Sequence, residues 1–132
     1  MSNGTMNVKL ELLQSIKDLC DSNKEVVLVS LCTTDGFPIT YTSIDELSTE
    51  ADKLAAISST ISALSNSSAR QMNQGKCDIT IIEAAVGNML FLTANYLETP
   101  CVLTIVANTK MTLATARYKT KNLAVAIGRI SE

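Results

Sequence analysis

The sequence predicts a single α+β domain in which a helix, two strands, a second helix, three strands and a third helix follow one another. Two observations predict this order. Apolar residues recur every three to four positions in three segments, and short β-branched runs separated by turn residues lie between them. A length of 132 residues suits one domain with a core that needs neither disulfides nor a metal. We expect the domain to cover residues 1–132, with residues 1–5 flexible.

The first helix and the first two strands are expected before residue 45. Apolar residues recur at helical spacing over 6–23, while the positions between them are polar. The run 25–34 is apolar on both faces, as in a central buried strand. Thr34-Asp35-Gly36 then predicts a hairpin turn, because glycine accommodates positive φ. Alternating residues over 37–44 predict the returning strand.

The second helix is expected to begin at Thr49 as N-cap, with acidic residues in its first turn, and to continue to Asn73 before Gly75. We expect its bulky stripe to pack on the sheet. That stripe comprises Leu54, Ile57, Ile61 and Leu64.

A second stripe on this helix keeps a spacing of four and three residues and is small apart from its last member. No charged residue occurs between Lys53 and Arg70, although an exposed helix face normally carries charges. Small residues at regular spacing let two helix backbones approach closely, so we expect a subunit contact here rather than a solvated serine-rich face. The stripe comprises Ala51, Ala55, Ser58, Ser62, Ser65, Ala69 and Met72.

Three strands are expected over 76–83, 89–94 and 101–108, followed by a helix over 110–130. In the first of these strands, alternation places Cys77, Ile79 and Ile81 toward the core. An open edge with such a β-branched run invites aggregation, so we expect a second copy of the chain to pair with it. The opposite face of the strand adds Asp78, Thr80 and Ile82 to the candidate dimer interface.

The composition points away from an enzyme. The chain has no histidine, which removes the commonest general base and imidazole metal ligands. Its four cysteines include no Cys-x-x-Cys pair, and its five glycines form no phosphate-binding loop. We therefore expect no catalytic residue, no cofactor and no metal. Three arginines, which we expect to serve structure or docking rather than as arginine fingers, are Arg70, Arg117 and Arg129.

Charge and localisation signals are equally plain. Residues 99–132 carry 5 basic and 1 acidic side chain, within a chain of net charge −2. The basic last helix is either a solvated face or a weak docking surface for an acidic partner, and nucleic acid is not an expected partner. The N-terminus lacks a signal-peptide pattern, and no run reaches the ~18 apolar residues of a membrane span. We expect a cytoplasmic protein.

Several stretches, in order over about residues 8–130, resemble the roadblock/dynein light chain family. The opening hairpin and the start of the long helix resemble that family, as do the later strands and the start of the last helix. The stretches are Val27-Leu28-Val29-Ser30 with Thr34-Asp35-Gly36-Phe37-Pro38-Ile39, Ala51-Asp52-Lys53-Leu54-Ala55-Ala56, Ile81-Ile82-Glu83 with Gly87-Asn88-Met89-Leu90-Phe91-Leu92, and Cys101-Val102-Leu103-Thr104-Ile105-Val106-Ala107 with Leu113-Ala114-Thr115-Ala116-Arg117.

The resemblance implies a roadblock/profilin-like sandwich, in which helices cover a five-stranded antiparallel sheet. It also implies a homodimer formed through the long helix and the edge of the third strand. Prokaryotic members of the family regulate or partner Ras-like small GTPases, and some are GTPase activators that act by positioning the partner's residues. Eukaryotic members are scaffolds. Two functions stay open: a homodimeric regulator or scaffold partner of a Ras-like small GTPase, or a ligand-sensing or structural dimerisation module with no GTPase contact.

Overall fold

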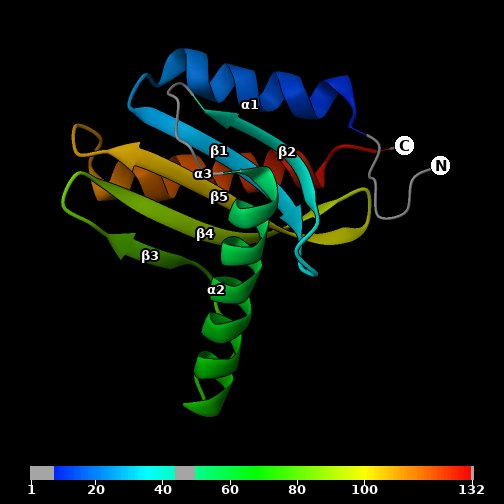
Figure 1. The fold of residues 1–132 in the computed structure, drawn as a ribbon, viewed down its shortest axis with the longest axis vertical. Helices are drawn as coiled ribbons and strands as arrows, with labels where there is room; N and C mark the ends of the chain where they lie inside the picture. Colours follow the sequence, from blue (N-terminus) through cyan, green and yellow to red (C-terminus); the bar gives the residue numbers. More distant parts are fainter. Residues whose placement is uncertain (1–7, 44–49, 132) are drawn as a thin grey trace.

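The structure of the protein is a computed structural model that describes residues 8–43 and 50–131. Within these residues, three helices and five strands follow one another in the predicted order (Figure 1). The N-cap of the second helix is Glu50 rather than the predicted Thr49, which lies outside the described residues, as do the predicted flexible residues 1–5. The elements are α1 (Leu10–Ser22), β1 (Val26–Thr33), β2 (Pro38–Ser43), α2 (Ala51–Gln71), β3 (Thr80–Glu83), β4 (Gly87–Tyr96), β5 (Thr99–Asn108) and α3 (Leu113–Gly128).

The five strands form one antiparallel sheet in the order β2-β1-β5-β4-β3. The helices α1 and α3 cover one face, and α2 crosses the other (Figure 1). The expected α+β sandwich with a five-stranded antiparallel sheet is therefore confirmed. The strands β2 and β3 are the two edges of the sheet.

The main core lies between the sheet and the α1/α3 pair. Alternate residues of β1 and β5 point to this face, and Leu31 lies opposite Leu103 in the ladder. The buried apolar residues of the helices close the layer, and each is at most 5% exposed. They include Leu12 and Ile16 of α1 and Leu123 and Ile127 of α3.

The layer under α2 is thinner and partly polar. Ala55 packs with Cys32 of β1 and Val102 of β5, which lie opposite each other in the ladder. One turn further on, the Thr104 hydroxyl donates to Ser58 Oγ at 2.8 Å, and both residues are 0% exposed. The small side chains let α2 lie close to the sheet. Only its first half is buried there, and its C-terminal half projects beyond β3 (Figure 1).

This arrangement corrects the prediction for α2. Leu54 is buried as expected, but Ile57 and Leu64 of the same bulky stripe are 41% and 63% exposed. The small stripe supplies the contact with the sheet instead, through Ala55 and Ser58. The reason is the sheet surface itself, where a threonine offers a hydroxyl partner rather than space for a bulky apolar side chain.

A second correction concerns β3, which begins at Thr80 rather than at residue 76. The chain before it is held by side chains of other elements. The amide of Cys77 donates to Asn66 Oδ1 of α2 at 3.2 Å, and Asp78 accepts from Lys121 of α3. These contacts draw the segment away from the ladder.

The hairpin from β4 to β5 is tighter than expected, with Leu97 and Glu98 both at positive φ.

Candidate interaction surfaces

The predicted dimer-interface residues of α2 divide into two groups. Ala55 and Ser58 are 1% and 0% exposed within a single protomer, so their side chains have no surface to offer a second copy. Within the protomer these two residues pack on the sheet. The others are half-buried, except that Met72 is 72% exposed. They are Ala51, Ser62, Ser65 and Ala69.

The predicted residues of the third strand are also divided. Thr80 pairs opposite Phe91, and Ile82 pairs opposite Met89, so both lie on the α2 side of the sheet. Ile79 and Ile81 pack against the main core, as predicted, but Cys77 does not join it and instead bonds Asn66 of α2. Asp78 departs from the expected alternation because it precedes the strand. Its carboxylate contacts α3, which covers the opposite face of the sheet.

Large apolar side chains are exposed on α2 and on the hairpin formed by β3 and β4. We call these residues the apolar edge. Sequence analysis missed most of them, because the helical period assigned Ile57 and Leu64 to the core and gave no signal at the turn residue Val86. The apolar edge comprises Ile57, Leu64, Met72, Ile82 and Val86, which are between 38% and 83% exposed.

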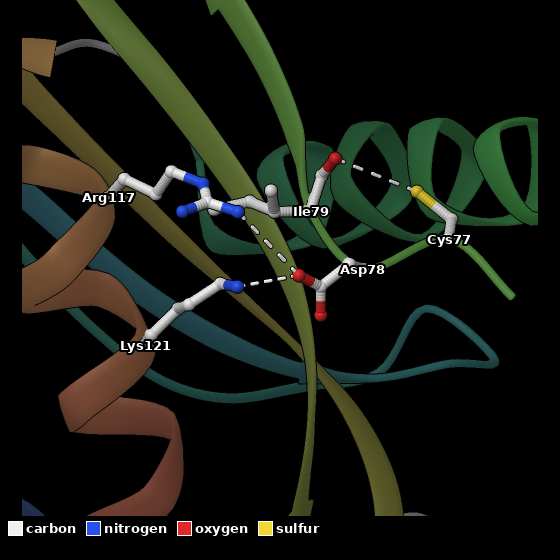
Figure 2. A network of polar contacts seen from close by, with 5 residues as sticks. All are labelled: Cys77, Asp78, Ile79, Arg117 and Lys121. Carbon is white, nitrogen blue, oxygen red and sulfur yellow. Dashed lines mark hydrogen bonds and ion pairs between the residues drawn. The ribbon is translucent and has the colours of Figure 1, made fainter. Parts of the chain in front are cut away.

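A polar cluster joins the segment before β3 to α3 (Figure 2). Lys121 Nζ donates to Asp78 Oδ2 at 2.5 Å, and Arg117 Nη2 lies 3.8 Å from the same oxygen. The hydrogen bond from Lys121 holds the pKa of the Asp78 carboxyl below its ordinary value of 3.8, with the nearby positive charges adding to the effect. Two of the basic residues of the last helix are therefore partnered within the protomer.

Three of the four cysteine thiols have a pKa above the ordinary value. Cys32 and Cys101 are buried, and loss of solvation raises the pKa of each thiol to about 11. Burial likewise raises the pKa of Cys20. Over residues 8–43 and 50–131, no group of three or more His, Cys, Asp or Glu side chains is placed to hold a metal ion. Among the helices of the same residues, none is long and apolar enough to cross a membrane.

Comparison with solved structures identifies the fold, whereas comparison of sequences does not. No protein-family profile matches the chain, and no curated protein matches it by sequence. Solved structures match over nearly its whole length. The gliding protein MglB from Thermus thermophilus is 11% identical with a TM-score of 0.81, covering 98% of this chain and 96% of its own. Myxococcus xanthus MglB is 13% identical with a TM-score of 0.81, covering 93% and 96%.

A roadblock/LC7 domain from Streptomyces avermitilis is 20% identical with a TM-score of 0.71, covering 84% of this chain and 89% of its own. At these identities the likeness concerns the fold. The chain has the fold of the roadblock/LC7 proteins, and the resemblance read from the sequence is confirmed at that level.

Proposed function

We propose that the protein is a non-catalytic, homodimeric regulator or scaffold partner of a Ras-like small GTPase. The apolar edge is the observation that carries the proposal. Five large apolar side chains are exposed on α2 and the β3–β4 hairpin, in a chain of which only 18% of residues are charged. The helix α2 and the strand β3 are neighbours in the fold, and large exposed apolar side chains on neighbouring elements are typical of protein-interaction surfaces. The fold shared with MglB supports a regulator of this class.

In the proposed dimer, the outer edge of β3 pairs with the same edge of a second copy, which removes an open strand edge. The projecting half of α2 then covers the partner copy. Ser62, Ser65, Ala69 and Met72 lie along that half, together with Leu64 of the apolar edge. The dimer would present a surface to a protein partner that neither copy has alone.

We propose no catalytic group in this chain. Any acceleration of GTP hydrolysis would come from positioning the partner's own residues and excluding water. Arg117 already contacts Asp78, which favours a structural role for it over an arginine finger. The absence of histidine and the high thiol pKa values of Cys32 and Cys101 are consistent with this assignment.

Sedimentation and co-purification test the two halves of the proposal separately. The wild type should sediment as a dimer at micromolar concentration, and Leu64→Glu with Ile82→Glu should shift it toward monomer. Leu10→Glu, at an 82% exposed residue of α1, is the matched control and should leave the dimer intact. A monomeric wild type contradicts the dimer.

The partner is tested with the small GTPase encoded nearest to the gene of this protein, loaded with GTP or GDP. Complex formation with one nucleotide state supports the regulator, and a change in hydrolysis rate distinguishes an activator from a scaffold. A dimer that binds the GTPase in neither state favours the alternative, a ligand-sensing or structural dimerisation module. Hydrolysis by this protein alone would contradict the non-enzymatic assignment.

A further inference from the structure

The strand β4 is longer than the strand that covers its edge. β4 spans Gly87–Tyr96, whereas β3 pairs only with residues from Asn88 to Phe91 (Figure 1). The residues of β4 that follow Phe91 therefore have no strand beside them on that side within the described chain. A hollow of about 230 Å³ separates them from the segment before β3, and Cys77 and Asp78 of that segment are bonded to α2 and α3 instead of to β4.

The register shows which main-chain groups are left at this edge. The amide of Ala84 donates to the carbonyl of Gly87 at 2.9 Å, so Gly87 directs its main-chain groups toward β3. Hydrogen-bonded pairs alternate along an antiparallel strand, so every second residue of β4 points the same way. Thr93 and Asn95 continue that series beyond the start of β3. Their N–H and C=O groups have no hydrogen-bonding partner among the described residues.

Hollows lie on both sides of this edge. A cavity of about 370 Å³ opens between β4 and α3, and Leu92, Ala124 and Val125 give it an apolar lining. A second cavity, of about 510 Å³, lies on the α2 side. Thr93 lines both, so the two hollows meet at the open edge of β4.

The cavity on the α2 side is positively charged. Arg70 and Lys76 are its only charged lining residues, and neither forms an ion pair within residues 8–43 and 50–131. Asn66 fixes this wall, because its amide nitrogen donates to the Ser62 carbonyl while its oxygen accepts from the Cys77 amide. Three hydroxyls in the lining have no partner in the described chain, and they are Thr34, Ser62 and Thr93.

We propose that the open edge of β4 binds an extended segment of a partner protein as an added strand. Main-chain groups of the segment would pair with Thr93 and Asn95, and its side chains would alternate between the two cavities. An apolar side chain fits the cavity between β4 and α3. An acidic side chain fits the cavity of Arg70 and Lys76. The partner is thus a peptide segment of alternating acidic and apolar residues, and this inference does not depend on the GTPase proposal.

The experiment uses the full ¹⁵N-labelled chain and a synthetic peptide, acetylated and amidated, of sequence Thr-Val-Glu-Val-Glu-Val-Thr. Binding should shift the amide signals of Thr93 and Asn95 and slow their hydrogen exchange. One control peptide carries N-methyl groups on alternate residues, which removes the main-chain donors without altering the protein. Another replaces glutamate with lysine. Both controls should fail to bind.

Protein variants test the two cavities. Arg70→Glu with Lys76→Glu should weaken binding about tenfold, because each reversal turns an attraction into a repulsion. Val125→Glu, at a 52% exposed residue, should weaken it by a similar factor. Lys53→Glu, an exposed change on α2 outside both cavities, is the control and should leave affinity unchanged.

Three results would overturn the proposal. The first is equal binding of the N-methylated peptide, and the second is the absence of binding at millimolar peptide. The third is protection of the Thr93 and Asn95 amides in the free protein that rises with protein concentration, which would assign the edge to a second copy of this chain. Dimerisation through the apolar edge is tested separately by sedimentation, and none of these three results decides it.

Discussion

The hydroxyl of Thr104 on β5 donates a hydrogen bond to Ser58 Oγ on α2 at 2.8 Å, and both side chains are fully buried. This contact links residues 46 positions apart in the sequence and joins α2 to the central strand of the sheet. It lies in the thin layer that positions the whole projecting helix.

Ser58→Ala should lower the free energy of unfolding by about 1–3 kcal/mol, because it leaves the buried Thr104 hydroxyl without its acceptor. The double variant Ser58→Ala with Thr104→Val removes both groups and should recover about 1 kcal/mol or more relative to Ser58→Ala. Urea unfolding at one fixed protein concentration measures both. A double variant less stable than Ser58→Ala would show that the hydroxyl pair does not stabilise this layer as a unit.

Gly87 begins β4 where the backbone of β5 comes very close. A Cβ at this position would overlap the carbonyl oxygen of Ala107. Because that oxygen belongs to the main chain of β5, it cannot move aside without distorting the strand. Gly87→Ala should therefore destabilise the fold by about 1–3 kcal/mol.

Gly128 on α3 provides the matched control for this change. Its added Cβ meets no atom closer than 3.9 Å, so Gly128→Ala should leave stability unchanged or raise it by less than about 1 kcal/mol. Thermal unfolding of the two variants gives the comparison. Equal melting temperatures would contradict the close approach at Gly87.

The cluster of Asp78, Lys121 and Arg117 predicts a pH dependence (Figure 2). The pKa of Asp78 is lower in the folded chain than its ordinary 3.8, so its ionised form favours folding. This contribution is complete above pH 3.8 and is lost as the pH falls through the lower folded value. Asp78 is 69% exposed, and the contribution should therefore be below about 1 kcal/mol.

Asp78→Asn should accordingly be slightly less stable than the wild type at neutral pH and equal to it in strong acid. Added salt should narrow the difference at neutral pH. Urea unfolding across the pH range tests this. A stability difference that grows as the pH falls would contradict the assigned direction of the pKa shift.

The thiols should fall into two classes of reactivity. Cys32 and Cys101 are fully buried, and the pKa of each is about 11, so both should resist a thiolate-specific reagent at pH 8 until the protein unfolds. Cys20 and Cys77 are half-buried and should react first. Mass mapping after partial labelling identifies the sites. Early labelling of Cys32 would show that the layer under α2 opens readily.

The order of the elements could be predicted because hydrophobic periodicity is a local property of the sequence. The face that α2 buries could not, because Ser58 is buried through its partner on a strand far along the chain. The same holds for the start of β3. Alternating apolar residues continue back to Cys77, but contacts with Asn66 and Lys121 end the ladder at Thr80.

The candidate surfaces were predicted less completely for a related reason. Exposure of Leu64 depends on where the sheet ends beneath the helix, and helical spacing does not contain that information. The unpaired edge at Thr93 and Asn95 depends on the difference in length between two neighbouring strands. That difference follows from the same tertiary contacts that shorten β3.

The projecting half of α2 has a sequence that favours the helix only weakly. Ser65, Asn66, Ser67 and Ser68 follow one another there, and all are weak helix formers because their side chains compete for backbone hydrogen bonds. With little of the sheet beneath it, this half gains little helix stability from packing within one protomer. The last turns of α2 would then be rigid only when another surface lies against them. Assembly would set the length of the rigid helix, and its final turns would act as a reporter of whether a partner is bound.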